Sequence, residues 1–126
     1  MTVDPRDSQI VYAATSSLGV LKSVDGGTTF VAASNGLPTL PDDPATYVPT
    51  SRTGSVQINP LHRSVLYVGT EGGGVYRSSD GADSWQAINA GLDDPNVFGL
   101  ALDPVDPDIL YASTNSSVFR TRNARP

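Results

Sequence analysis

The phrase SVDGGTTF, residues 23–30, returns as SSDGADSW at residues 78–85, and this repetition guides the interpretation of the whole chain. The surrounding sequence repeats as well. VYAATSSLGVLKSVDGGTTF (11–30) aligns without a gap on LYVGTEGGGVYRSSDGADSW (66–85), at a constant offset of 66 − 11 = 55 positions. A third copy, LYASTNSSVFRTRN (110–123), has a loop one residue shorter. An internal repeat of this kind predicts a fold assembled from successive similar units.

Each unit has the sequence features of short strands joined by tight turns. Upstream of every copy stands an apolar residue followed by Asp or Asn and then Pro, as in residues 3–5, 58–60 and 102–104. Such triplets mark turns, because Pro cannot continue a strand ladder and Asp or Asn hydrogen-bonds its own backbone. The runs between turns are rich in β-branched and aromatic residues, which is typical of antiparallel meanders. Twelve Gly and ten Pro leave little room for a long helix, so we expect an all-β fold.

The size of the complete unit predicts blades of a β-propeller, each an antiparallel sheet of four strands. The chain holds about two and a half of them. We expect a partial blade at 1–37 with only a stub of its first strand, a long inter-blade loop at 38–54, a complete blade at 55–92, and a partial blade at 93–126 without a fourth strand. We therefore expect either a longer chain or identical copies to complete the ring.

Charge and composition argue against several classes of partner. Thirteen acidic and eight basic residues give a net charge of −5, which disfavours binding to nucleic acid and to anionic lipid. No apolar run reaches the length of a membrane span, so membrane insertion is not expected. The absence of Cys excludes a disulfide framework, and His62 is the only histidine. We predict neither a metal site nor a cofactor.

The two phrases resemble the Asp-box, or BNR, repeat, whose pattern is Ser/Thr-x-Asp-x-Gly-x-Thr-Trp/Phe. This repeat occurs in β-propellers of sialidases, xyloglucan-cleaving glycoside hydrolases, sortilin-type receptors and photosystem II assembly factors. The first copy fits with Ser23, Asp25, Gly27, Thr29 and Phe30, and the second with Ser78, Asp80, Ser84 and Trp85. In the second copy Ala82 replaces the second Gly, a change expected to alter that turn.

The resemblance implies a structural role for this motif, on a peripheral turn between the third and fourth strands and away from any active site. The residue types suit that role. Asp accepts backbone N–H bonds across a turn, Gly adopts positive φ, and the aromatic ring returns to the space between sheets. We therefore interpret both copies as scaffolding.

Ligand-binding residues are expected on the opposite end of the blades, where the connections vary. The connection from Gly36 to Asn59 spans 59 − 36 = 23 positions. The matching connection of the next unit, from Gly91 to Asp103, spans 103 − 91 = 12 positions. A long loop on a rigid scaffold is either a binding element or a solvated connection. The residues we single out for ligand binding are Tyr47, Arg52, Glu71 and Asn115.

No residue is singled out as catalytic. The adjacent acids at 42–43 are expected to form a solvated patch, and Asp103 and Asp106 are expected to form turns. The Arg-Ile-Pro segment and the Tyr-Glu pair of a sialidase are not recognisable. Tyr12, Tyr67 and Tyr111 recur regularly, which favours packing between blades over a sugar-binding platform.

Three functions fit these observations. The leading hypothesis is a noncatalytic propeller segment that serves as a binding or assembly scaffold for a glycan or protein. The first alternative is a fragment of a secreted glycoside hydrolase, sialidase-like or xyloglucanase-like, with its catalytic residues largely outside this chain. The second is a self-assembling propeller lectin. The sequence leans against an enzyme, and the resemblance implies an extracytoplasmic or secreted location.

Overall fold

The computed structural model describes residues 2–15, 19–37, 39–40, 43–47, 53–70, 74–88, 96–103, 105–106, 109–114 and 117–121. In these residues the chain is all-β. Its strands are β1 (Thr2–Asp4), β2 (Asp7–Ala14), β3 (Val20–Ser23), β4 (Val31–Ala32), β5 (Thr39–Leu40), β6 (Asp43–Tyr47), β7 (Thr53–Ile58), β8 (Leu66–Thr70), β9 (Gly74–Ser78), β10 (Gln86–Ala87), β11 (Val97–Leu102), β12 (Leu110–Thr114) and β13 (Val118–Thr121).

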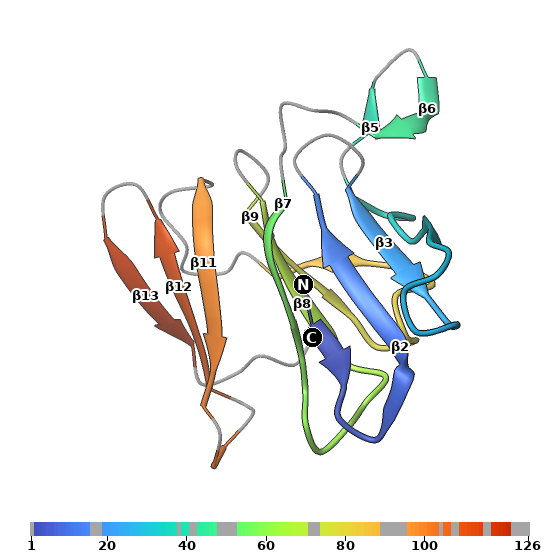
Figure 1. Ribbon diagram of the computed structural model, residues 1–126. Helices are drawn as coiled ribbons and strands as arrows, with labels where there is room; N and C mark the ends of the chain where they lie inside the picture. The colour runs from blue at the N-terminus through green and yellow to red at the C-terminus, as the bar shows by residue number, and fades with distance from the viewer. Residues whose placement is uncertain are drawn as a thin grey trace.

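The strands form three antiparallel blades that stand side by side (Figure 1). The first has the strand order β1-β2-β3-β4, the second β10-β9-β8-β7, and the third, in its described part, β11-β12-β13. Every strand in a blade pairs with its neighbour in sequence, as in a meander. The predicted all-β fold of propeller blades is thereby confirmed, with β1 as a first strand of only three residues.

Two hydrophobic cores lie between the blades, one on each side of β8. Successive residues of a strand point to opposite faces, so Leu66 and Val68 reach the core shared with the first blade, and Tyr67 reaches the core shared with the third. All five residues of β8 are buried as a result. Tyr12 lies in the first core in the same way, so the packing role predicted for Tyr12 and Tyr67 is confirmed.

The exposed fractions of side chains at equivalent positions of the repeat show which faces of each blade a neighbouring blade covers. Val20 and Val75, which face the next blade, are 0% and 4% exposed, whereas the equivalent Val118 of the third blade is 68% exposed. The aromatic position that faces the preceding blade shows the reverse order. Trp85 of the second blade is 4% exposed, and Phe30 of the first blade is 37% exposed. In the arc formed by the three described blades, the first blade and the third blade thus each have one apolar face that no other described blade covers.

The connection predicted as a long loop contains a small hairpin. β5 pairs antiparallel with β6 in a separate two-stranded sheet. The hairpin stands at the end of the blades where β2 finishes and β3 begins (Figure 1). This end is opposite the β1–β2 and β7–β8 turns. The hairpin therefore lies at the same end of the blades as the β2–β3 connection.

Trp85 joins the first two blades by hydrogen bonds as well as by packing. Its indole Nε1 donates to the carbonyl of Ala33 at 2.7 Å, and its backbone N–H donates to the carbonyl of Asn35 at 2.8 Å. Gly36 lies directly against this contact with φ of +95°, and a Cβ at this position would overlap the Trp85 carbonyl oxygen. The close approach of the two backbones therefore requires Gly36.

Gly36→Ala is predicted to destabilise the chain by at least about 3 kcal/mol, because it combines a strained φ with displacement of Trp85. Gly27→Ala is the matched control, since Gly27 has φ of +93° and its Cβ would meet no atom closer than 4.0 Å. The control should cost about 1–2 kcal/mol. Urea unfolding followed by Trp85 fluorescence measures both variants, and equal losses would contradict the proposed backbone contact.

Candidate functional site

The 23–30 turn is a closed network of hydrogen bonds centred on one carboxylate. The hydroxyl of Ser23 donates to Asp25 Oδ1 at 2.7 Å and accepts the N–H of Gly27 at 2.9 Å. Thr29 donates to Asp25 twice, from its backbone N–H at 2.8 Å and from its hydroxyl at 2.5 Å. The bonds from the Thr29 hydroxyl, the Thr29 N–H and the Ser23 hydroxyl lower the pKa of Asp25 to about 2.

The 78–85 turn has the same network although Ala82 replaces a glycine. Ser78 donates to Asp80 at 2.8 Å and accepts the N–H of Ala82, while Ser84 donates its N–H and hydroxyl to Asp80. Ala82 adopts φ of 74°, and it is buried in the core between the first two blades. The expectation that Ala82 alters the turn is not met: Ala82 adopts the left-handed conformation, and burial of its methyl group offsets part of the conformational cost.

Three carboxyl groups of the described residues have a lowered pKa and are held as anions. The Ser84 hydroxyl and N–H lower the pKa of Asp80, and the N–H groups of Asp106 and Val105 lower that of Asp103. A general acid for glycoside hydrolysis needs a raised pKa and a partner carboxyl across the scissile bond. Asp25, Asp80 and Asp103 instead accept hydrogen bonds from their own turns, an arrangement suited to fixing backbone conformation.

The four residues singled out for ligand binding are not brought together by anything that the structure describes. Tyr47 is the last residue of β6, in the hairpin of the long connection, and its side chain is outside the description. Arg52, Glu71 and Asn115 lie outside the described residues altogether. Their role in binding stays a prediction.

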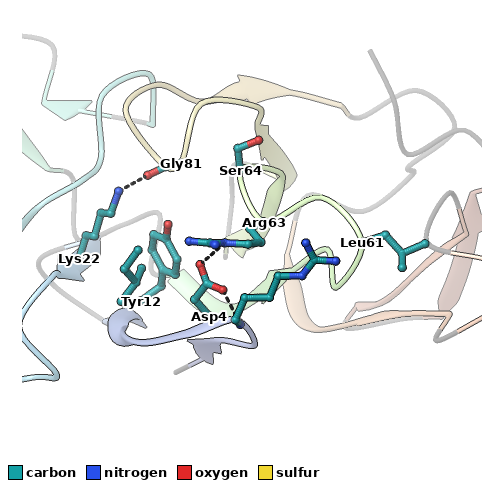
Figure 2. Close-up of a pocket in the computed structure, with 9 residues that line it drawn as sticks. Asp4, Tyr12, Lys22, Leu61, Arg63, Ser64 and Gly81 are labelled. Atoms are coloured by element: carbon teal, nitrogen blue, oxygen red, sulfur yellow. Dashed lines mark hydrogen bonds and ion pairs between the residues drawn. The ribbon is translucent and has the colours of Figure 1, made fainter.

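A pocket of about 470 Å³ lies between the first two blades, at a place where no sequence motif indicated a site. Three turns contribute to it: β1–β2, β7–β8 and the 78–85 turn (Figure 2). Its lining residues are Asp4, Arg6, Ile10, Tyr12, Lys22, Leu61, Arg63, Ser64 and Gly81. Sequence reasoning treated Asp4 and the segment 59–64 as turn formers of separate units. It missed the pocket because their meeting depends on how the blades pack.

Charged side chains bridge the two blades along this pocket. Asp4 is buried and accepts from Arg63 Nε at 2.9 Å and from the backbone N–H of Arg6 at 2.8 Å. Lys22 Nζ donates to the carbonyl of Gly81 at 3.0 Å and lies 5.5 Å from the centre of the Tyr12 ring. Burial, followed by the charge of Asp4, raises the pKa of Tyr12. The Tyr12 hydroxyl is therefore a proton donor at neutral pH.

Two features are absent from the described residues. No helix there is both long and apolar enough to cross a membrane. No group of three or more His, Cys, Asp or Glu side chains within the described ranges is placed to hold a metal ion.

Comparison with known proteins gives one curated sequence relative of interest. No protein-family model matches the chain. The oligoxyloglucan-reducing end-specific xyloglucanase of Emericella nidulans is 40% identical over 73 residues, covering 48% of this chain and 9% of the relative. The chain therefore spans about a tenth of the length of that enzyme.

Three similar solved structures show the fold. An ancestral GH74 enzyme matches with a TM-score of 0.72 and 19% identity, over 97% of this chain and 17% of its own. The structure of YCF48 bound to D1 peptide matches with a TM-score of 0.65 and 17% identity, over 94% of this chain and 36% of its own. The GH74 xyloglucanase from Xanthomonas campestris matches with a TM-score of 0.56 and 17% identity, over 96% of this chain and 28% of its own. The chain thus resembles a portion of the propeller of GH74 xyloglucanases.

The low pKa of Asp25 predicts a specific dependence of stability on pH. A carboxyl whose pKa falls on folding stabilises the chain above its unfolded pKa of 3.8, and this contribution is lost as pH falls through the folded value of about 2. Asp25→Asn should therefore unfold at lower urea than the parent at pH 7, and the difference should shrink between about pH 4 and pH 2.

Urea midpoints from pH 7 to pH 2 measure this effect. Asp83→Asn is the control, because Asp83 is an exposed acid in the other turn and takes no part in the Asp25 hydrogen-bond network. A gap between parent and Asp25→Asn that stays constant across the range would contradict the carboxylate network as its source.

Proposed function

We propose that this chain is a noncatalytic β-propeller segment that binds a glycan of the xyloglucan class at the end of the blades bearing the β5–β6 hairpin. The similarity to a xyloglucanase at 40% identity supports the choice of glycan over protein as ligand. The hairpin supports the choice of face, because it projects from a rigid pair of blades where binding elements of such scaffolds are found.

The observation that supports the noncatalytic part of this proposal is that three carboxylates of the described residues form structural hydrogen bonds and ion pairs. Asp25 and Asp80 each accept three or more hydrogen bonds or contacts from their own turn, and Asp4 pairs with Arg63. Glycoside hydrolysis requires two carboxyl groups that face the scissile bond from opposite sides. The three carboxylates instead lie at turns, where they fix backbone and blade contacts.

A fragment of a glycoside hydrolase is the second candidate. The same xyloglucanase relative favours it, because the matched region is only 9% of the length of that enzyme. In that case the catalytic carboxylates belong to another part of the propeller. An extracytoplasmic or secreted location fits both candidates, because their polymeric substrate does not enter cells.

We further propose that identical copies cover the apolar faces at the two ends of the arc when the chain is alone. The face that carries Val118 is equivalent to the one that carries Val75, which the next blade covers. The face that carries Phe30 is equivalent to the one that carries Trp85, which the preceding blade covers. Contact between the third blade of one copy and the first blade of another is therefore head-to-tail.

The glycan hypothesis predicts binding of a xyloglucan oligosaccharide without release of new reducing ends. Tyr47→Ala should weaken binding about three- to tenfold, through loss of an aromatic surface for the sugar ring. Tyr111→Ala, in β12 of the third blade, is the control. Calorimetric titration and a reducing-end assay are run on the same samples. Hydrolysis would favour the enzyme fragment, and absence of binding would rule out the glycan proposal for this chain.

The assembly hypothesis predicts a discrete oligomer by light scattering, and Val118→Asp should shift it to smaller mass. A carboxylate in the centre of an apolar contact has to lose its hydration without a partner, so the contact weakens. Val105→Asp is the control, since Val105 is exposed in a turn outside the blade faces. An unchanged mass in Val118→Asp would show that this face does not join identical copies.

A further inference from the structure

The pocket between the first two blades opens on the turn side of the propeller. Its residues come from the β1–β2 turn, the β7–β8 turn and the 78–85 turn, together with β2 and β3. The β5–β6 hairpin stands at the other end of the blades (Figure 1). A ligand in this pocket is therefore distinct from one bound at the hairpin.

The pocket is positively charged in a chain that is acidic overall. Arg6, Lys22 and Arg63 line it together with one acid, Asp4, whereas the whole chain has a net charge of −5. Asp4 is satisfied by Arg63 Nε and by the backbone N–H of Arg6. The remaining guanidinium nitrogens of Arg63 and the side chain of Arg6 have no partner among the described residues, which leaves them available to an anion.

Tyr12 adds a donor that has no partner in the fold. The residue is only 2% exposed, yet its hydroxyl makes no hydrogen bond within the described part of the chain. The hydroxyl lies between Lys22 and Arg63 and points into the space that they enclose (Figure 2). Because the hydroxyl faces the pocket and no described group of the fold accepts its proton, it is free to donate to an acceptor on a ligand.

Gly81 keeps the space beside these donors open. A Cβ at this position would lie 3.5 Å from Lys22 Nζ and 3.9 Å from the Tyr12 hydroxyl, so any side chain would enter the region between them. Its φ of +70° is itself a conformation that favours glycine. Lys22 already donates one hydrogen bond to the Gly81 carbonyl, and its ammonium group has two further protons to donate.

We propose that this pocket binds a sugar acid, a uronate, with its carboxylate among Arg63, Lys22 and Tyr12. A carboxylate accepts the several donors that converge there, and charge-assisted bonds of this type are the strong ones. Ser64 provides a hydroxyl for the ring hydroxyls, and Ile10 and Leu61 provide apolar contact for the C–H face of the ring. The volume of about 470 Å³ lies within the usual range of small-ligand sites and accommodates a monosaccharide.

Titration of the 126-residue chain with D-glucuronate, followed by amide chemical shifts at low salt, tests the proposal. D-glucose is the neutral probe and inorganic phosphate is the alternative oxyanion. We expect glucuronate to shift the amides of residues 4, 6, 12, 22, 63, 64 and 81, and glucose to leave them unchanged. Raising the salt concentration from about 0.02 M to about 0.2 M should weaken binding severalfold, since the charges are partly exposed.

Two conservative variants separate ligand binding from folding. Tyr12→Phe removes only the hydroxyl and should weaken glucuronate binding about tenfold, the value of one hydrogen bond to a charged group. Arg6→Gln retains the backbone N–H that Asp4 accepts but removes one of the three positive charges that line the pocket, so it should weaken binding about fivefold at low salt. Tyr76→Phe and Arg120→Gln are the matched controls, because neither residue lines the pocket. Both controls should bind like the parent.

Each result decides the proposal. Selective glucuronate binding that Tyr12→Phe and Arg6→Gln weaken, in variants with the circular dichroism and urea midpoint of their controls, would support a uronate site. Equal binding of glucose, phosphate binding at least as tight as that of glucuronate, or no binding by the parent would overturn it. Parent-like binding by Tyr12→Phe would overturn the role of the unpartnered hydroxyl.

Discussion

Each blade of this chain has apolar side chains on both faces, and both faces have to be covered by neighbouring blades. The central strand β8 shows this constraint most directly, because all five of its residues are buried between the first and third blades. Val20 and Val75 are buried for the same reason, whereas Val118 is exposed where no described blade follows. Burial of these apolar faces is the main favourable contribution to the free energy of folding, and the turns and ion pairs depend on the packing that it produces.

The two repeated turns connect local conformation to this packing. Within each turn, a Ser hydroxyl and an Asp carboxylate accept hydrogen bonds from backbone N–H groups of the turn. These bonds fix the backbone conformation and thereby the position of the aromatic residue that follows. In the second turn that aromatic is Trp85, which packs against the first blade and donates to Ala33. The turn therefore fixes a hairpin and also positions the side chain that joins two blades.

The same junction creates the pocket. The Asp4–Arg63 ion pair and the bond from Lys22 to the Gly81 carbonyl both cross from the first blade to the second. Residues that belong to different repeat units, and that have structural roles within them, line one cavity only because the blades pack at this angle. A repeat architecture can thus form a binding site at each junction without altering the motif that defines the blade.

The sequence by itself determined the all-β fold, the blades and the positions of the tight turns. These features depend on local chemistry, namely strand-forming runs, the 23–30 and 78–85 turns, and a repeat that recurs at a constant spacing. Tertiary structure alone decided that Ala82 substitutes for glycine, that the connection after the first blade contains a hairpin, and that Tyr12, Lys22 and Arg63 converge. Lys22 and Arg63 are 63 − 22 = 41 positions apart, and only the packing of one blade against the next brings them together.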